Sequence, residues 1–540
     1  MSKMFNSVRE VIEHSAEKFG KKKFLYCDGN EISFDEINRI SNKVGNLFLE
    51  LGVKKGDKVA LYLPNCLEFI YCWFGLAKIG AVMVPINTFF KSAETSYVLN
   101  NSDSKLLITD SNALEMIIGA SENCPNVEYI ISTNPSQSAG IINFYDFLEK
   151  QPEELPMVEM KNDDDAAILY TSGTTGHPKG CVEPQSYYLV NPRLWADALE
   201  LTSEDRVLTP LPLFHMNPQI LSIMGSLILG ASVIVLDRFH PRSWWEDVIK
   251  FDATQFHYLG VMPAILYSMD SNANDRKHRV RVTLGAGISH KYHQGYEKRF
   301  GLKAIEVFGM TEVGLTMTAP LYGDRRLGTG CMGKPLPGFH AKVVDENNHE
   351  VPIGEVGELV IKEDYRPEGS AMMKGYYKNS DATQKAWEGG WFHTGDMVKK
   401  DEIGFYYFVD RKKDIIRRSG ENISSMEVED CVKAHPKVME AAVVPVPDPI
   451  REQEVRVCIV LKEGESAATV PEQEIIDWCS ERLAYFKVPR YVEYINEFPK
   501  TASQKIQKSI LKENLPEQCF DNAIKAQISL KEKITSGANK

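Results

Sequence analysis

The sequence lacks closely spaced cysteines, although its 540 residues include ten of them. No two form a Cys-x-x-Cys pair, and the closest two, Cys66 and Cys72, have no histidines nearby at zinc-site spacing. This pattern argues against a structural zinc site. Scattered thiols are typical of a protein that keeps its cysteines reduced, so we expect a cytoplasmic location.

Basic residues are also outnumbered, with 62 Lys and Arg against 74 Asp and Glu. The formal net charge is −12, whereas a nucleic-acid-binding protein normally presents a basic face. We therefore expect no nucleic-acid partner, although local loops can still bind small anions within an acidic protein.

No uninterrupted apolar run of membrane-spanning length is present. The stretch from Asn217 to Leu236 is uncharged, but serines and glycines interrupt it, and Gly230 separates a helix-like half from a β-branched half. We expect a buried helix followed by a buried strand here, and no membrane span. The first twenty residues show helical spacing rather than the apolar block of a signal peptide.

A chain of this length is too long for one compact core, so several domains are expected. In the first hundred residues, helical patterns at 37–51 and 68–79 alternate with short apolar runs at 58–63 and 82–86. This alternation is typical of α/β architecture with mostly parallel sheets.

The composition changes twice further along the chain. Glycine and proline are dense between residues 323 and 338, and the alternating runs at 341–345 and 358–362 are typical of β-strands. After residue 410, helices at 426–434 and 471–483 flank strands at 441–446 and 455–461, enough for a small domain. We expect an α/β fold in which residues 1–410 form a large domain of mostly parallel sheets with a β-barrel-like subdomain. Residues 414–515 would form a small mobile α+β domain, and residues 516–540 a tail.

The segment from Thr171 to Gly180 reads TSGTTGHPKG and follows a strand-like run at 166–170. A glycine loop that leaves a strand can direct several backbone N–H groups at a phosphate, and hydroxyls and a lysine add donors and charge. The spacing is not that of a Walker A loop. We expect a phosphate-binding loop that uses Thr171, Ser172, Gly173, Thr174, Thr175, Gly176 and Lys179.

Five further motifs follow in order: EVFGMTE at 306–312, WFHTGD at 391–396, FVDRKKD at 408–414, SGENIS at 419–424 and KTASQKI at 500–506. Together with the loop, they resemble the signatures of the adenylate-forming superfamily, which comprises acyl-CoA synthetases, peptide-synthetase adenylation domains and beetle luciferases. The resemblance covers the chain from residue 30 to residue 512, approximately. Segments such as 71–86 and 405–411 resemble crotonobetaine/carnitine-CoA ligases most.

The resemblance implies a role for each motif residue. Lys505 would stabilise the charge that develops when a carboxylate attacks the α-phosphate, and Arg411 would reach a phosphate. Glu312 would bind Mg²⁺, with Thr171 as a second metal-site residue, and a carboxylate in this turn suits that ion. His215 would gate the acyl pocket. ATP and AMP would further contact Gly287, Glu306, Phe308, Gly309, Met310, Thr311, Asp396 and Phe408. CoA would contact Ser419, Gly420 and Glu421, and the small domain would turn about Lys413.

Two positions depart from the family pattern. Gln185 stands where many relatives have a histidine, and Gln504 stands where a glycine is usual before the lysine. The first change is expected to alter the acyl or phosphate surroundings, and the second to alter the backbone around Lys505.

We therefore predict an ATP-dependent acid–CoA ligase that uses ATP, Mg²⁺ and CoA and releases AMP and pyrophosphate through an acyl-adenylate. The acid would be a carnitine- or crotonobetaine-like compound, or a short- or medium-chain fatty or aryl acid. A trimethylammonium group would favour aromatic neighbours, for which Phe214, Tyr258, Phe308 and Trp195 are candidates. The sequence is compatible with assembly of identical subunits.

Three other functions compete with this prediction. An adenylation enzyme that loads a carrier protein would share the motifs, but no carrier-type Asp-Ser-Leu motif follows near the C-terminus. A luciferase-like oxygenase would need an oxidative second step. A non-catalytic nucleotide-binding protein would not need Lys505, Glu312 and Asp396, all of which are present.

Overall fold

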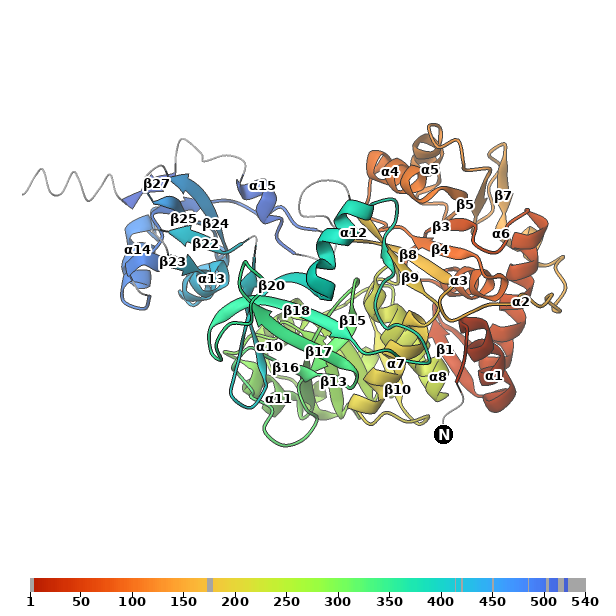
Figure 1. Cartoon of the computed structure of the whole chain (residues 1–540), viewed down its shortest axis with the longest axis horizontal. Coiled ribbons are helices and arrows are strands. Elements are labelled where there is room, and N and C mark those ends of the chain that lie inside the picture. The colour runs from red at the N-terminus through yellow and green to blue at the C-terminus, as the bar shows by residue number, and fades with distance from the viewer. Residues whose placement is uncertain are drawn as a thin grey trace, which may run out of the picture. The chain divides into compact units, whose positions relative to one another are not determined.

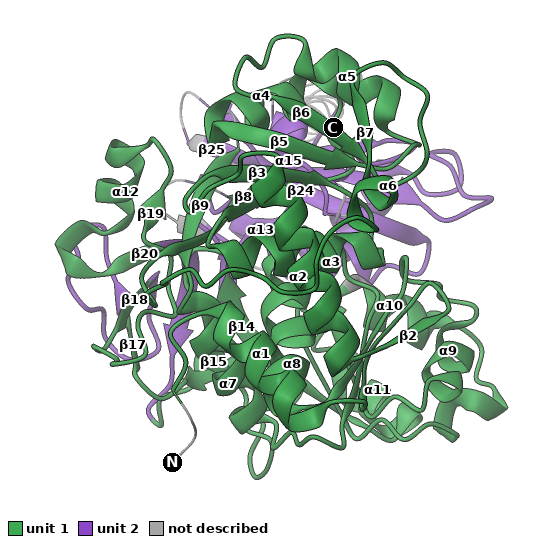
Figure 2. Cartoon of the chain, turned by 90° about the vertical axis from the view of Figure 1, so that its right-hand side faces the viewer, with its two compact units in different colours: residues 1–342, 360–393, 403–407 green, residues 343–359, 394–402, 408–540 purple. Residues whose placement is uncertain are grey.

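The computed structural model describes residues 4–171, 178–412, 414–418, 421–448, 451–483, 485–501, 505–512 and 519–522. The chain divides into two compact units, drawn in green and purple in Figure 2. Unit 1 comprises residues 1–342, 360–393 and 403–407, and unit 2 comprises residues 343–359, 394–402 and 408–540. Four strands contain residues of both units: β17 (Phe339–Val344), β18 (Val356–Glu363), β20 (Phe392–Lys400) and β21 (Tyr406–Arg411).

One sheet of unit 1 carries the strands on either side of the predicted phosphate loop. Its strand order is β19–β9–β8–β4–β3–β5–β6–β7. The strands are β3 (Lys58–Tyr62), β4 (Val82–Pro85), β5 (Ser104–Thr109), β6 (Tyr129–Ser132), β7 (Ile141–Asn143), β8 (Asp165–Thr171), β9 (Lys179–Pro184) and β19 (Gly375–Tyr376). Pairing is parallel from β8 to β7, and antiparallel between β8 and β9 and between β9 and β19.

Helices pack on both sides of this sheet (Figure 1). On one face, α4 (Ser92–Ser102) and α5 (Leu114–Ser121) bury Val98, Leu99 and Ile117 against strand residues. Next to the sheet, α2 (Phe34–Glu50) and α3 (Leu67–Ile79) pack on each other, and α6 (Phe144–Leu148) follows β7. A Cβ at Gly75 of α3 would lie 2.6 Å from a methyl carbon of Val44, so only glycine permits this approach.

The sequence explains where α2 begins and why α3 is buried. α2 starts after Ser33, whose side chain accepts from the Glu36 N–H while the Glu36 carboxylate accepts from the Ser33 N–H. α3 is apolar on nearly all sides, and every residue from Phe69 to Ile79 is buried, including Lys78. These helices confirm the alternating pattern that the sequence predicted over residues 37–86.

A second sheet of unit 1 carries the other predicted nucleotide segments, and its strands in this unit run in the order β16–β15–β14–β13–β12–β10–β11–β1–β2. The strands are β1 (Lys23–Cys27), β2 (Asn30–Ser33), β10 (Arg206–Thr209), β11 (Ser232–Val235), β12 (Gln255–Leu259), β13 (Val282–Ala286), β14 (Lys303–Met310), β15 (Gly314–Thr318) and β16 (Cys331–Pro335). Pairing is parallel from β14 to β1, so the loops after these strands share one edge of the sheet.

Helices also cover this sheet. α9 (Trp244–Lys250), α10 (Val261–Ser268) and α11 (His293–Phe300) bury large side chains against it, including Trp244, Leu266 and Tyr296. Elsewhere in unit 1, α1 (Val8–Phe19), α7 (Tyr187–Ala198) and α8 (Gly225–Leu229) pack together. The remaining short helices of this unit are η2 (Ala273–Arg276), α12 (Ser380–Ala386) and η3 (Glu388–Gly390).

The uncharged stretch from Asn217 to Leu236 folds as expected. It forms a buried π-helix, η1 (Pro218–Met224), then α8 and the buried strand β11. Gly230 lies between α8 and β11 with a positive φ of 77°, which suits glycine. None of the helices in the described ranges combines the length and apolar character that crossing a membrane requires.

Unit 2 contains an α+β fold. Its sheet has the order β23–β22–β25–β26–β27, and β24 also pairs with β25. The elements are β22 (Ile416–Arg418), β23 (Glu421–Ile423), α13 (Ser425–Lys433), β24 (Val438–Asp448), β25 (Glu452–Leu461), α14 (Glu472–Ser480), η4 (Tyr485–Lys487), β26 (Tyr491–Tyr494), α15 (Lys508–Lys512) and β27 (Phe520–Asp521). α13 and α14 pack in one core with β24 and β25, whereas Ile506 and Leu511 pack in a second cluster with Ala442 and Cys458.

The predicted α/β architecture with a smaller C-terminal α+β part is confirmed. The predicted domain limits, 1–410, 414–515 and 516–540, and the mobility of the small domain stay predictions.

Candidate active site

Two strand ends flank the predicted phosphate loop. β8 ends at Thr171 and β9 begins at Lys179, and these residues face each other across the antiparallel pair. Both are half-buried. The loop residues Ser172, Gly173, Thr174, Thr175 and Gly176 lie outside the described residues.

Glu312 and Lys179 share one neighbour, Tyr376. The Tyr376 hydroxyl donates a hydrogen bond to Glu312 Oε1 at 3.1 Å, and Lys179 Nζ lies 4.8 Å from the centre of the Tyr376 ring. Tyr376 reaches this position because β19 pairs with β9 and places it opposite Cys181. Burial and the charge of Glu312 raise the pKa of Tyr376, so its hydroxyl stays a donor. The structure therefore brings the lysine after the loop close to the predicted magnesium residue.

The backbone around Glu312 is held by buried side chains of α7. The Tyr187 hydroxyl donates to the Thr311 carbonyl at 3.1 Å, and Asn191 Oδ1 accepts from the Leu315 N–H at 2.8 Å. The Glu312 carbonyl accepts from the Met373 N–H at 3.0 Å. These contacts fix the turn that carries the carboxylate.

Glu306 and Gly287 are joined directly. The Glu306 carboxylate accepts from the Gly287 N–H at 3.0 Å, from the Ile288 N–H at 3.2 Å and from the Tyr258 hydroxyl at 2.6 Å. Burial raises the pKa of Glu306, although these three donors oppose the shift. Glu306 thus holds the loop after β13 against β14.

The rest of this predicted segment continues along β14 into the turn that holds Glu312. Phe308 is buried, Gly309 is exposed, and Met310 and Thr311 are half-buried. A Cβ at Gly309 would lie 2.6 Å from the Gly314 carbonyl oxygen, so this residue must remain small.

Glu183 is a buried acid that the sequence analysis did not single out. It lies in β9, has no exposed surface, and neither carboxylate oxygen has a hydrogen-bond partner among the described residues. Burial, and then the charge of Glu312, raise the pKa of Glu183 well above its usual value. An acid whose pKa rises on folding favours the folded state at low pH, and this contribution is lost as the pH rises from the unfolded pKa toward the folded pKa.

We expect Glu183→Gln to raise the stability of the protein near pH 7.5. Above the unfolded pKa, folding must keep this carboxyl protonated, which costs about 1.4 kcal/mol for each pH unit up to the folded pKa, whereas glutamine is neutral in both states. Urea or thermal unfolding of both proteins between pH 4 and pH 8 would measure the effect, which should vanish near pH 4. The exposed Glu17→Gln is the matched control. A variant less stable than the parent at every pH would contradict this account.

His215 follows β10 in a loop that a buried asparagine holds in place. Asn65 Nδ2 donates to the carbonyls of Leu211 at 3.0 Å and Leu236 at 2.8 Å, and its Oδ1 accepts from the Leu213 N–H at 2.7 Å. His215 is half-buried, with its ring centre 4.6 Å from that of Phe214. The backbone of the loop that carries His215 is therefore held by Asn65, which lies between β3 and α3.

Two of the aromatic candidates for a cationic substrate lie in the core. Trp195 is fully buried, and a Cβ at Gly225 would come within 2.2 Å of its ring. Tyr258 is also fully buried and bonded to Glu306. Neither ring face is open to a cation.

Gln185 is also buried. Its Oε1 accepts a hydrogen bond from the Val8 N–H at 3.0 Å, so it anchors the start of α1.

In unit 2, Asp396 and Arg411 form an ion pair. Asp396 is fully buried in β20, and its Oδ1 lies 2.8 Å from Arg411 Nε. Next to this pair, Glu358 accepts from the Gly395 N–H at 3.1 Å and pairs with Lys412 at 2.8 Å. Phe408 lies half-buried in β21. Two predicted nucleotide residues are thus in direct contact.

Lys505 belongs to the same unit. The carbonyl of Lys505 accepts from the Thr501 N–H at 2.7 Å, and its own N–H donates to the Thr501 hydroxyl at 3.1 Å. Surrounding protein and then the Arg411 charge lower the pKa of Lys505, while Asp396 opposes the shift. Lys505 as a residue is exposed, so water screens these effects. Lys505 therefore interacts electrostatically with both Arg411 and Asp396.

The predicted hinge and CoA residues are only partly described. Lys413, Ser419 and Gly420 lie outside the described residues, and Glu421 is described by its backbone, which begins β23. Beside the predicted hinge, Asp410 Oδ2 accepts from the Ser425 hydroxyl at 2.8 Å and the Met426 N–H at 3.2 Å. A carboxylate at the start of α13 is stabilising because the N-terminus of a helix carries partial positive charge.

Magnesium fits the residues of unit 1. No group of three or more His, Cys, Asp or Glu side chains is arranged to hold a metal within the described part of the chain. Mg²⁺ usually takes one or two protein carboxylates and completes its shell with phosphate oxygens and water. Glu312 supplies the single carboxylate that such a shell needs, and Lys179 is a partner for phosphate oxygens rather than for the ion.

The chain matches two family models. Residues 12–377 match the model described as AMP-binding enzyme, and residues 427–505 match the AMP-binding enzyme C-terminal domain. A crotonobetaine/carnitine–CoA ligase from Escherichia coli is 36% identical over 522 residues, which covers 94% of this chain and 98% of that protein. The enzyme of the same name from Shigella sonnei shows the same identity and coverage.

Solved structures are similar over the same length. An anthranilate CoA ligase in complex with anthranoyl-AMP has a TM-score of 0.85 and 27% identity, covering 95% of this chain and 97% of that one. An o-succinylbenzoate CoA synthetase from Bacillus subtilis, in complex with its acyl-adenylate, has a TM-score of 0.82 and 27% identity, covering 95% and 99%.

Proposed function

Because this chain belongs to the AMP-binding enzyme family, we propose that its substrate is a small carboxylic acid of the betaine type, such as carnitine or crotonobetaine. The observation that carries this proposal is 36% identity over 94% of the chain with crotonobetaine/carnitine–CoA ligases. The similarity extends over nearly the whole of those relatives, well beyond the motifs.

The enzyme is an ATP-dependent acid–CoA ligase that works through an acyl-adenylate, as the sequence predicted. A carboxylate oxygen of the acid attacks the α-phosphorus of ATP, the bond to the β-phosphate breaks, and pyrophosphate leaves. The CoA thiolate then attacks the acyl carbon, and AMP leaves. Acid, ATP and CoA are its small-molecule partners.

In unit 1, the residues around the phosphate loop act on the triphosphate. Lys179 places a positive charge near the phosphates, and Tyr376 orients the Glu312 carboxylate by its hydrogen bond. Glu312 would hold Mg²⁺, with Thr171 beside it, and the bound ion would neutralise charge on the phosphates. Glu306 supports the Gly287 loop, which would lie along the nucleotide.

In unit 2, the ion pair of Asp396 and Arg411 serves the ribose and phosphate. Asp396 can accept hydrogen bonds from both vicinal ribose hydroxyls, and Arg411, its partner at 2.8 Å, would reach a phosphate. Lys505 stabilises charge that grows on the carboxylate and α-phosphate during adenylation, a positional and electrostatic role rather than acid–base catalysis.

The location that we propose is the cytoplasm. All ten cysteines lie within the described ranges, and none of them forms a disulfide. Free thiols in this number suit a reducing compartment.

An acid panel tests the substrate. We expect pyrophosphate release with carnitine and crotonobetaine to exceed that with butyrate, octanoate and benzoate by at least about tenfold in kcat/KM, corresponding to about 1.4 kcal/mol of transition-state binding. Reactions with and without CoA separate adenylation from thioester formation. Faster turnover of benzoate or octanoate would replace the betaine proposal with an aryl or fatty acid and leave the ligase activity intact.

A further inference from the structure

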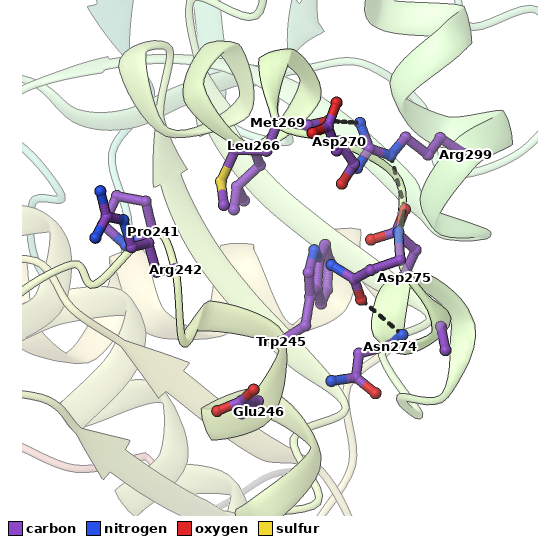
Figure 3. A pocket seen from close by; sticks show the side chains of 12 residues that line it. Pro241, Arg242, Trp245, Glu246, Leu266, Met269, Asp270, Asn274, Asp275 and Arg299 are labelled. Atoms are coloured by element: carbon purple, nitrogen blue, oxygen red, sulfur yellow. Dashed lines mark hydrogen bonds and ion pairs between the residues drawn. The ribbon is translucent and has the colours of Figure 1, made fainter.

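A cavity of about 330 Å³ lies in unit 1 at the end of α10 (Figure 3). A volume of this size suits a small organic molecule. Its apolar wall is formed by Pro241, Trp245, Leu266 and Met269. None of the residues that line it belongs to the motifs of the candidate active site.

The cavity lies at the opposite edge of the sheet from the predicted nucleotide loops. Those loops follow the carboxyl ends of the parallel strands β13 and β14. α10 begins after β12 and returns along the sheet, so its last turn, with Leu266, lies toward the edge where the strands begin. Trp245 confirms this placement, because it packs on Phe300, just before β14, with ring centres 4.7 Å apart. The cavity is therefore distinct from the adenylation site.

The walls are held in place by contacts that do not need a ligand. Arg299 donates from Nε to Asp275 Oδ2 at 2.8 Å, and from its other nitrogens to the carbonyls of Tyr267, Met269 and Asp270 at 2.7–3.0 Å. These bonds tie the end of α10 to η2. Trp245 is stacked on His278 with ring centres 4.5 Å apart. A preformed cavity lowers the entropy cost of binding.

The charges that line the cavity are separated. Arg299 and Asp275 neutralise each other at 2.8 Å. In the part of the chain that the structure describes, the exposed Arg242 and Asp270 side chains form no ion pair. Figure 3 shows Arg242 on one side of the cavity and Asp270 on the other, with Leu266 between them and Trp245 on the wall below. Glu246 also lines the cavity, but Figure 3 places its side chain away from both Arg242 and Asp270. The cavity therefore has a positive end at Arg242, an apolar middle and a negative end at Asp270.

We propose that this cavity binds a small zwitterion. Its carboxylate would pair with Arg242, its ammonium group with Asp270, and its apolar body would contact Trp245 and Leu266. Amino acids and betaines share this chemistry, and the proposal does not depend on which acid the enzyme activates. A ligand with only one charge would leave one end of the cavity without a partner.

Binding to the full-length protein tests the proposal without any turnover. Equilibrium dialysis or calorimetry would compare 4-aminobutyrate and carnitine, which carry a primary and a quaternary ammonium group, with butyrate and choline, which each carry a single charge. We expect at least one of the zwitterions to bind, and more tightly than either single-charge compound. The preferred one identifies the class of ammonium group.

Variants assign the binding to the cavity. Arg242→Ala and Asp270→Asn should each weaken zwitterion binding about tenfold, the usual loss for a hydrogen bond to a charged group. Arg238→Ala, an exposed arginine in the same loop that does not line the cavity, is the matched control. Unchanged thermal unfolding and unchanged adenylation by the variants would show that they remain folded. Zwitterion binding that both variants retain, or no zwitterion binding at all, would overturn this site and leave the acid panel's result untouched.

Discussion

Replacing Lys505 with alanine is expected to slow acyl-adenylate formation by about 10²–10³-fold or more, the usual loss when a charge-stabilising group is removed from a transition state. Lys505 is exposed, and its pKa responds to the charges of both Arg411 and Asp396. Because its role is confined to the first step, attack of CoA on supplied acyl-AMP should change little. Acid-dependent exchange of pyrophosphate into ATP measures the first step, and thioester formation from acyl-AMP measures the second.

A neighbouring lysine provides the control for this variant. Lys500 lies five residues earlier and pairs with Glu440 at 2.6 Å, so Lys500→Ala removes a charge from the same segment without touching the proposed role. It should leave both steps within about twofold of the parent, as expected for an exposed ion pair. An equal loss of both steps in Lys505→Ala would contradict a role limited to adenylation.

Glu312→Gln is expected to lower kcat/KM for MgATP by about 100-fold or more, because a neutral amide is a poor ligand for Mg²⁺. Glutamine has the same shape and can still accept a hydrogen bond from Tyr376, so the turn held by Tyr187 and Asn191 should persist. Activity titrated against Mg²⁺ should show a higher requirement for the metal, with partial recovery at high concentrations.

Tyr376→Phe tests how much the orientation of the Glu312 carboxylate matters, because it leaves the charge of Glu312 unchanged. This variant removes only the 3.1 Å hydrogen bond and should cost about tenfold or less, with a smaller shift in the Mg²⁺ requirement. An unchanged Mg²⁺ requirement in Glu312→Gln would remove this residue from the metal site.

Much of the fold was predictable because its signals are local. The apolar residues at 58–63 and 82–86 became β3 and β4, and the helical spacing at 37–51 became α2 with a capping box that begins at Ser33. Gly230 marked the change from helix to strand because its φ of 77° suits glycine. The motif segments that resembled the family lie at strand ends, as in β8, β14 and β20.

The partners of the site residues were not predictable, because they come from distant parts of the chain. Tyr376 reaches Glu312 across 64 residues, through the pairing of β19 with β9. Asn65, in the loop that follows β3 of the other sheet, holds the loop that carries His215. Glu183 stands in a strand where an acid would normally be exposed, and only the packing reveals its burial.

Transfer of an oxygen isotope tests the central claim most directly. The enzyme would be given its acid with both carboxylate oxygens labelled as ¹⁸O, together with ATP, Mg²⁺ and CoA, and the released AMP would be analysed by mass spectrometry. If the carboxylate attacks the α-phosphorus, each AMP carries one ¹⁸O atom and pyrophosphate carries none. Unlabelled AMP, or ADP with the label in phosphate, would contradict an acyl-adenylate.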